Sequence, residues 1–219
     1  MAENRYAVVV FDWDGTLIDS ASAIVECIQH AAREMGLPVP PRERASHVIG
    51  LGLQDSLRHA VPELPPVGYN AFAALYRRHF LAREEAMSLF PGVRELLAEL
   101  EAQGRRLAIA TGKSRSGLDR ALDASGLRAH FVASRCADES HPKPHPAMLA
   151  ALCAELGVAR ESMLMIGDTS HDLEMAANAG VDAVAVTYGA HPEVSLRALA
   201  PRGLVSSVAE LRAWLRSNA

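Results

Sequence analysis

Short apolar runs alternate with helix-like segments along most of this 219-residue chain, and this alternation constrains the fold more than any other feature. The first run, residues 6–10, is continuous and rich in β-branched side chains, which is typical of a strand buried on both faces of a parallel sheet. Four further strand candidates follow it: residues 107–111, 131–134, 163–168 and 183–187. Because strands separated by helices form parallel sheets covered on both faces, we expect an α/β fold with a doubly wound parallel sheet.

Residues that favour helix ends mark the segments between these strands. Prolines stand near the first turns, and glycines follow the last turns, as helix geometry favours. The predicted helices of the sheet lie at about residues 91–103, 114–125, 146–156 and 171–179.

Residues 19–87 break the alternation, because this stretch has no convincing strand. It reads instead as several helices with proline-rich loops between them. These helices are predicted at about residues 21–35, 42–49, 53–60 and 67–86. We therefore expect a helical module inserted after the first strand, with residues 1–17 and 88–219 forming the core and residues 18–87 forming a cap.

Composition narrows the classes of function. The formal net charge of −4 and the pI of about 6.1 do not indicate the excess of positive charge that is typical of nucleic-acid-binding proteins. No apolar stretch reaches membrane-spanning length, and the first residues do not resemble a signal peptide. Cys27, Cys136 and Cys153 show neither disulfide nor metal-ligand spacing, which favours a reducing cytoplasm. We expect a cytoplasmic protein without nucleic-acid or membrane partners, and the sequence predicts no oligomeric state.

Two aspartates, Asp12 and Asp14, stand one residue apart directly after the first predicted strand. Side chains alternate across a strand, so both should point to one side while Trp13 points to the other. Two carboxylates held this close cannot both stay ionised and dry without a proton or a cation between them. A tight turn explains the Asp14-Gly15 pair but leaves Asp12 unexplained, so we interpret the pair as functional.

Other polar signals stand at the ends of later strands. Residues 111–114 follow the second strand, Asp168 and Asp172 follow a later one, and Lys143 lies in a proline-rich loop. Open α/β sheets bind ligands at the carboxyl ends of their strands, so these side chains are predicted to form one site.

In this order, the motifs resemble those of the haloacid dehalogenase (HAD) superfamily, from Asp12 to Asp172. The matching motifs are D-x-D-G-T at residues 12–16, the hydroxyl residue Thr111, Lys143 and G-D-x-x-x-D at residues 167–172. The sequences at 17–20 and 143–146 look most like the phosphoglycolate-phosphatase-like branch. The resemblance implies a Rossmann-like HAD core, a helical cap and a phosphatase activity.

The catalytic roles are assigned with this resemblance in view. Asp12 is expected to attack phosphorus and form an aspartyl-phosphate, and Asp14 to protonate the leaving alkoxide and then activate water. Thr111 and Lys143 are expected to stabilise charge on the phosphoryl oxygens. Asp172 is expected to orient Lys143 or the waters of a bound metal.

A metal ion is predicted because four aspartates and a phosphate dianion would repel by more than Lys143 could offset. A ligand set of a few carboxylates, together with phosphate oxygens and waters, is the one that Mg²⁺ prefers. The resemblance implies that its ligands are the side chains of Asp12 and Asp168 and the backbone carbonyl of Asp14.

Substrate contacts are predicted on both sides of the site. In the core, Gly15 and Gly112 are expected to offer backbone amides to the phosphate beside Thr111 and Lys143. In the cap, His47 and the loop around Gly52 are candidates. The basic and polar content of the cap predicts a small anionic metabolite, without choosing phosphoglycolate over a sugar phosphate or a nucleotide.

Several alternatives stay open at this stage. A phosphosugar mutase of the β-phosphoglucomutase type shares both aspartates. A catalytically silent binding module would keep the fold but lose turnover. Trp13 is reminiscent of phosphonoacetaldehyde hydrolases, but that family lacks the acid at position 14 and needs a cap lysine, whereas residues 19–87 contain no lysine.

Overall fold

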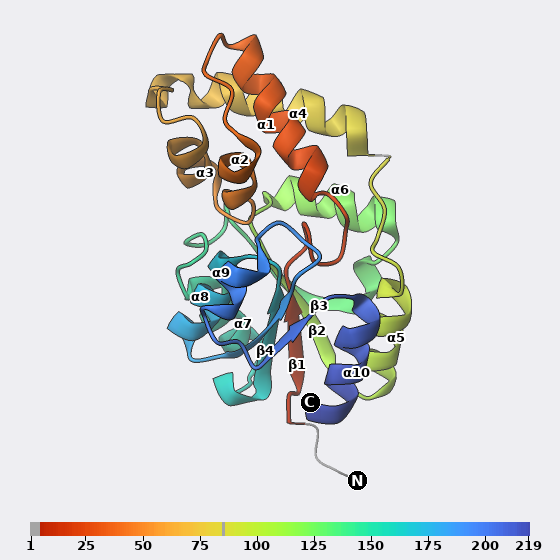
Figure 1. The fold of residues 1–219 in the computed structure, drawn as a ribbon. Coiled ribbons are helices and arrows are strands. Elements are labelled where there is room, and N and C mark those ends of the chain that lie inside the picture. Colours follow the sequence, from red (N-terminus) through yellow and green to blue (C-terminus); the bar gives the residue numbers. More distant parts are fainter. Residues whose placement is uncertain (1–4, 85) are drawn as a thin grey trace.

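A computed structural model describes residues 5–84 and 86–219, and a six-stranded sheet lies at its centre. All paired strands run parallel, in the order β3-β2-β1-β4-β5-β6 (Figure 1). The strands are β1 (Val8–Phe11), β2 (Arg106–Thr111), β3 (Phe131–Cys136), β4 (Met163–Gly167), β5 (Asp182–Val186) and β6 (Gly203–Val205). The predicted doubly wound α/β fold is confirmed, and β6 is an edge strand that the sequence analysis did not find.

Helices cover both faces of the sheet because successive strand residues face opposite ways. Val9 and Phe11 belong to one apolar cluster, and Val8 and Val10 belong to another. On the first face lie α5 (Val93–Ala102), α6 (Arg115–Ser125) and α10 (Val208–Asn218). On the second face lie α7 (Ala147–Leu156), α8 (Ser170–Ala179) and α9 (Glu193–Arg197). The helices α5 to α8 are confirmed to within two residues at each end, whereas α9 and α10 were not predicted.

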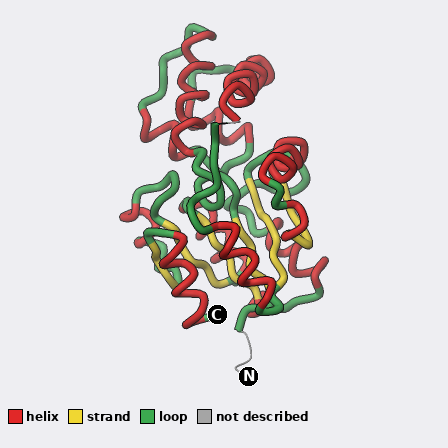
Figure 2. Tube along the Cα trace, turned by 90° about the vertical axis from the view of Figure 1, so that its right-hand side faces the viewer, coloured by secondary structure: helices red, strands yellow, loops and turns green. Residues whose placement is uncertain are grey.

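Four further helices, the cap helices, lie beyond the carboxyl ends of the strands (Figures 1 and 2). They are α1 (Ala21–Glu34), α2 (Arg42–His47), α3 (Leu53–Ala60) and α4 (Tyr69–Glu84). Their buried faces form a separate apolar cluster that includes Ile28, Leu57 and Phe72. Short 3₁₀ turns complete the described elements: η1 (Pro66–Gly68), η2 (Arg128–His130) and η3 (Arg160–Ser162).

Two linkers join the cap helices to the sheet, and they are hydrogen-bonded to each other. The amide of Asp19 donates to the carbonyl of Ser88 at 2.9 Å, and the amide of Phe90 donates to the carbonyl of Leu17 at 3.0 Å. The entry and exit of the inserted helices are therefore held together beside the end of β1.

The direction in which the chain adds strands to the sheet reverses between β1 and β4. The chain builds β2 and β3 on one side of β1, and β4, β5 and β6 on the other. Ligands of open α/β sheets bind at such a reversal, outside the carboxyl ends of the strands.

In the described part of the chain, no helix has both the length and the apolar character needed to cross a bilayer.

Candidate active site

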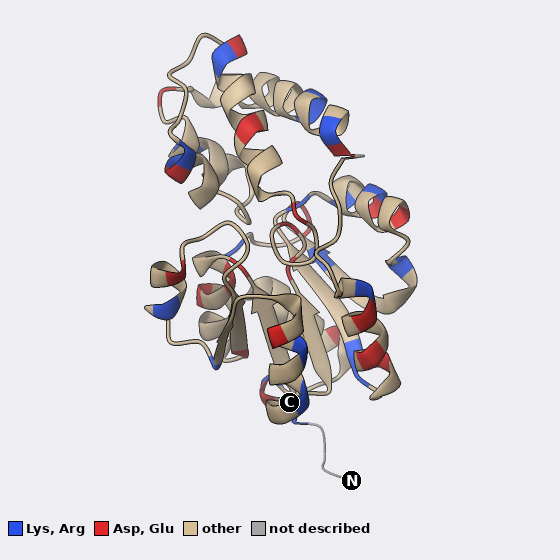
Figure 3. Cartoon of the chain, turned by 45° about the vertical axis from the view of Figure 1, so that its right-hand side comes forward, with Lys and Arg blue, Asp and Glu red and all other residues tan. Residues whose placement is uncertain are grey.

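Three carboxylates meet where the sheet reverses. Asp12 follows β1 and Asp168 follows β4, and these strands pair directly. Asp172 comes from the first turn of α8. One carboxylate oxygen from each residue lies within 4.8 Å of the other two, and all three residues are buried. Acidic segments are visible in this region, between the sheet and the cap helices (Figure 3).

Lys143 lies between two of these carboxylates. Its Nζ is 2.7 Å from Oδ1 of Asp12 and 2.6 Å from Oδ1 of Asp172, and its side chain has no exposed surface. Burial alone lowers the pKa of Lys143, but the two carboxylates raise it above its ordinary value overall. The ammonium group therefore stays charged next to Asp12.

Asp172 is held on both sides. Its Oδ2 accepts hydrogen bonds from the amide of Thr169 at 3.0 Å and from the hydroxyl of Thr169 at 2.7 Å, which forms a capping box at the start of α8. Its Oδ1 faces Lys143. This arrangement supports the predicted role of orienting Lys143.

Asp168 is fixed by donors from two loops. The Thr16 hydroxyl donates to Oδ1 at 2.8 Å, and the Ala190 amide donates to Oδ2 at 2.7 Å. Gly15 adopts a φ of +81°, and a Cβ at this position would lie 2.2 Å from Oδ2 of Asp168. Only glycine lets the loop after β1 approach Asp168 this closely, so Gly15 shapes the carboxylate site directly.

The electrostatics of the cluster favour a cation. Burial, which Lys143 offsets only in part, and the charge of Asp172 raise the pKa of Asp12 to about 7. Burial and the charges of Asp12 and Asp172 raise the pKa of Asp168 well above its usual range. Oδ2 of Asp12 is buried and has no hydrogen-bond partner among the described residues. A divalent ion with oxygen ligands fits this donor set, because it would neutralise the clustered carboxylates.

Asp14 is held apart from this cluster. The Ser20 hydroxyl donates to Oδ1 at 2.8 Å, and Nζ of Lys113 lies 3.0 Å from Oδ2. Trp13 is fully buried in the apolar core, with its ring edge-on to Phe131 at a centroid distance of 6.5 Å. The two aspartates therefore have different partners: Asp12 faces Lys143, and Asp14 faces Lys113.

Lys113 is a site residue that the sequence analysis missed. Besides its contact with Asp14, its Nζ lies 4.6 Å from the centre of the Phe80 ring on α4, so it links the core to the cap helices. A compositional signal could have found it. Of the 22 lysines and arginines in the chain, only Lys113 and Lys143 are lysines.

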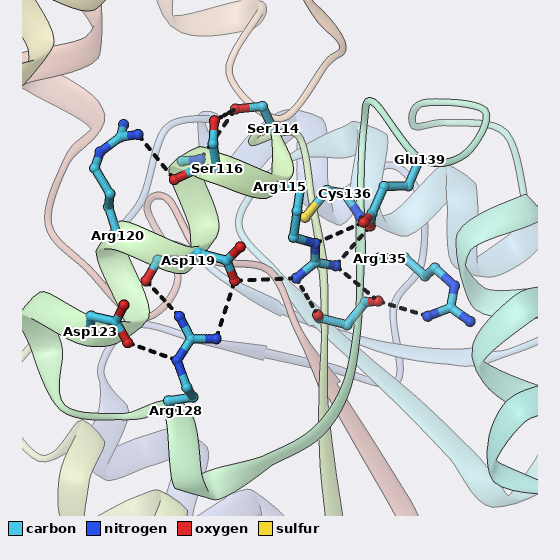
Figure 4. Close-up of polar contacts among 12 residues, drawn as sticks. Ser114, Arg115, Ser116, Asp119, Arg120, Asp123, Arg128, Arg135, Cys136 and Glu139 are labelled. Atoms are coloured by element: carbon cyan, nitrogen blue, oxygen red, sulfur yellow. Dashed lines mark hydrogen bonds and ion pairs between the residues drawn. The ribbon is translucent and has the colours of Figure 1, made fainter.

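The start of α6 fixes the end of the loop that follows Thr111 and carries Lys113. Arg115, the first residue of α6, donates to both carboxylate oxygens of Glu139 at 2.8 and 2.7 Å and to the Ser134 hydroxyl at 2.9 Å (Figure 4). These contacts tie the start of α6 to β3 and the loop after it. Ser114 caps the helix by accepting from the amide of Gly117 at 3.3 Å.

The cap helices meet this loop at Gly112. A Cβ at Gly112 would lie 2.6 Å from the carbonyl oxygen of Gly50, which no side chain could tolerate without movement. The predicted role of Gly112 in a phosphate cradle stays a prediction, and its contact with the cap gives a second reason for glycine.

A cavity of about 240 Å³ lies between the core and the cap helices. The core side presents Asp12, Asp14, Thr111, Lys113 and Ser114. The cap side is mainly apolar, with Ile24, Ile28, Leu57, Phe72 and Phe80 among its residues. The basic and polar residues counted along the cap sequence do not, for the most part, face the cavity.

Two predicted cap contacts lie outside the lining of this cavity as the structure describes it. Gly52 packs against Pro142, where an added Cβ would be 2.9 Å from the proline ring. His47 is exposed and stacks on His191 at a centroid distance of 5.2 Å.

Three histidines that showed no pattern along the sequence meet at the boundary of core and cap: His47, His171 and His191. Nε2 of His171 donates to the carbonyl of His47 at 2.7 Å, and Nε2 of His191 does so at 3.1 Å. Nδ1 of His191 accepts from the amide of Ser170 at 3.0 Å, so both of its ring nitrogens are engaged. Although ring nitrogens of all three lie within 4.8 Å of one another, these bonds make the group an anchor for the end of α2.

Comparison with known proteins places the chain in a well-populated group. Residues 9–186 match the model of a family described as haloacid dehalogenase-like hydrolase. The chain is 37% identical over 210 residues to "Probable phosphatase IndB" of Dickeya dadantii, covering 93% of this chain and 91% of that protein.

Two further similar proteins carry different activities in their names. The chain is 39% identical over 187 residues to "Tyrosine-protein kinase PtkA" of Mycobacterium tuberculosis H37Rv, which covers 83% of this chain but only 62% of that protein. A crystal structure of a predicted phosphoglycolate phosphatase from Haemophilus somnus 129PT superposes with a TM-score of 0.83 at 26% identity, over 94% of this chain and 96% of that one.

Proposed function

Because the chain belongs to the haloacid dehalogenase-like hydrolase family, in its phosphoglycolate-phosphatase-like branch, we propose that it is a Mg²⁺-dependent phosphatase of a small phosphorylated metabolite. The reaction proceeds through an aspartyl-phosphate on Asp12. In this proposal residues 1–17 and 88–219 are the catalytic core, residues 18–87 are the cap, and the enzyme works in the cytoplasm.

One observation carries the proposal: Asp12 and Asp14 are adjacent but are held in different ways. Asp12 keeps one buried oxygen without a partner among the described residues, as a nucleophile requires. Asp14 is positioned beside the cavity by Ser20 and Lys113, where it can exchange a proton with a bound ester or with water.

The first step transfers the phosphoryl group to the enzyme. Oδ2 of Asp12 attacks phosphorus, the bond from phosphorus to the ester oxygen breaks, and Asp14 gives its proton to that leaving oxygen. Lys143 and the Thr111 hydroxyl stabilise the charge on the phosphoryl oxygens, and Asp172 keeps Lys143 in place.

The second step releases phosphate. Asp14, now ionised, takes a proton from a water molecule whose oxygen attacks phosphorus, and the bond from phosphorus to Asp12 breaks. The proton returns Asp14 to its starting state, so the cycle balances. When Mg²⁺ is bound by the side chains of Asp12 and Asp168 and the carbonyl of Asp14, it supplies positive charge against the dianionic phosphoryl group.

The mutase alternative has less support. A phosphosugar mutase must also hold the second phosphoryl group of a bisphosphate. In the described part of the cap, Arg77 is the one cationic side chain that lines the cavity, and it is exposed.

Substitution of the nucleophile tests the proposal. We expect Asp12→Asn to reduce phosphate release from simple monoesters to background, while Asp19→Asn, an exposed neighbour, keeps full activity. Acid-quenched wild-type enzyme should carry one phosphoryl group on the peptide with Asp12. Unchanged turnover in the folded Asp12→Asn variant would contradict the assignment, and absence of turnover in the wild type would favour a silent binding module.

A further inference from the structure

The cavity above the two aspartates has an unusual division of polarity. Its core side holds the groups that act on phosphate, while its cap side is built from aliphatic and aromatic side chains. Among the described cap residues that line it, Ser56, Tyr76 and Arg77 are the ones with polar side-chain groups. Ser56 already donates to the carbonyl of Val48 at 3.2 Å, and Arg77 is exposed. The cap therefore offers few partners for hydroxyl or carboxylate groups of a substrate.

An aromatic pair lies next to the expected position of the leaving group. Tyr76 and Phe80 are one helical turn apart on α4, with ring centroids 5.8 Å apart and planes inclined by 27°. Lys113 lies over the Phe80 ring and also pairs with Asp14. Since Asp14 protonates the leaving oxygen in the proposed mechanism, the organic group on that oxygen would lie against this pair.

Cavity size limits the organic group. An apolar cavity of about 150 Å³ is sufficient to bind benzene. The volume here, about 240 Å³, thus has room for one ring with its phosphoryl group. Apolar walls gain from covering a ring, whereas sugar hydroxyls buried against them would lose their hydrogen bonds to water.

We propose that the preferred substrates are phosphate monoesters of small arylalkyl alcohols, with the ring held between the aliphatic cap residues and the Tyr76–Phe80 pair. This inference rests on the proposed phosphatase function and specifies its substrate class. It differs from the small polar anion that the cap sequence predicts.

The test compares esters whose leaving alcohols have similar acidity. The full chain, with Mg²⁺, is assayed for phosphate release from 2-phenylethyl phosphate, ethyl phosphate, 2-phosphoglycolate and glucose 6-phosphate. We expect kcat/KM for 2-phenylethyl phosphate to exceed that for each of the others by about tenfold or more, the discrimination that apolar pockets reach.

Variants locate the preference in the cap. Tyr76→Ala should lower the ratio of kcat/KM for 2-phenylethyl phosphate over that for ethyl phosphate by about tenfold, mainly through KM. Tyr76→Leu, which keeps an apolar side chain, should lower the ratio less. This variant replaces Tyr76→Ala in the test if the alanine variant unfolds at the assay temperature. Leu81→Ala, on the exposed side of α4, is the matched control and should leave the ratio unchanged.

The two proposals fail in different ways. If no monoester releases phosphate, the phosphatase function itself is wrong. If phosphate is released but 2-phosphoglycolate or glucose 6-phosphate exceeds 2-phenylethyl phosphate, or if folded Tyr76 variants keep the wild-type ratio, the substrate class is wrong and the phosphatase function stands.

Discussion

Two aspartates separated by one residue have different surroundings because of two lysines. Lys143 neutralises Asp12 deep in the core, and Lys113 holds Asp14 at the edge of the cavity. Asp14 and Lys113 should therefore affect proton transfer to and from the substrate, and a substrate that needs no protonation can isolate this contribution.

Pre-steady-state kinetics of Asp14→Asn test this at the level of single residues. With p-nitrophenyl phosphate, whose leaving group departs without a proton, we expect the variant to keep a burst of p-nitrophenol. Its steady-state turnover should fall by about 100-fold or more because water is no longer activated. With ethyl phosphate, no burst should appear.

Lys113→Met should show the same pattern with a smaller loss, about tenfold, because Asp14 stays but loses its partner. Arg33→Met, which removes an exposed cation on α1, is the control. Equal losses with both substrates in the burst phase would indicate that Lys113 acts on substrate binding instead.

The contrast between the lysines shows what could be predicted at this scale. Lys143 was found because its loop matches a family motif, and Asp12, Asp168 and Asp172 were brought together by strand order. Lys113 stands next to Gly112 in a segment that was itself singled out, but its partner Asp14 lies 99 residues away along the chain. Nothing local indicates an ion pair across that separation, so only the folded structure reveals it.

Among the elements, helix α2 of the cap is hydrogen-bonded to the core at its last two residues. Its last carbonyl, that of His47, accepts from two core imidazoles, and Ser46 donates to the carbonyl of Ala190 at 2.6 Å. Burial lowers the pKa of His171 and lowers that of His191 to about 4, so both imidazoles are neutral donors near pH 7. These bonds hold the cap against the core.

Replacing one of these donors should loosen the cap locally. We expect His171→Phe to weaken docking of α2 by about 1 kcal/mol, the net value of one hydrogen bond, which corresponds to roughly fivefold faster hydrogen exchange in residues 42–50. His59→Phe, an exposed position on α3, provides the comparison. If the His171→Phe variant exchanges at the wild-type rate, the anchoring role is wrong.

Prediction of the elements was uneven for physical reasons. The strands β1 and β4 are apolar along their length, and β2 is apolar between Arg106 and Thr111, because both faces of each strand are covered, so their sequences are distinctive. The edge strand β6 has three residues, of which one, Val205, is buried, and this leaves almost no pattern to detect. The cap helices were found, but their apolar residues face both their own core and the cavity, and periodicity cannot separate these two surroundings.

For the molecule as a whole, metal binding and pH should be coupled. Without metal, raised carboxylate pKa values mean that the folded state binds more protons than the unfolded state, so Asp12 contributes less to stability as pH rises from about 4 to about 7. A divalent ion replaces those protons and removes the repulsion. Its stabilising effect should therefore grow as pH rises through this window.

Thermal melting with and without MgCl₂ measures this coupling. At 100 times the Kd, Mg²⁺ should stabilise by about 2.7 kcal/mol, or roughly 5–10 °C in Tm for a chain of this size at pH 8. The shift should be clearly smaller at pH 5.5 and should disappear in Asp168→Asn, while Asp19→Asn keeps it. A shift independent of pH, or one that survives in Asp168→Asn, would contradict the proposed metal site.

The scarcity of lysine has a practical consequence for labelling this protein. Apart from the amino terminus, the two primary amines of the chain are those of Lys113, with 11% of its side chain exposed, and Lys143, with none. Amine-reactive dyes and crosslinkers, which modify the outer surface of most proteins at many points, would here find few targets: the α-amine, whose ordinary pKa is below that of a lysine, and Lys113, which is mostly buried and paired with Asp14. Immobilisation through amines would therefore favour the amino terminus over the two lysines, and the 20 arginines leave guanidinium chemistry as a second route.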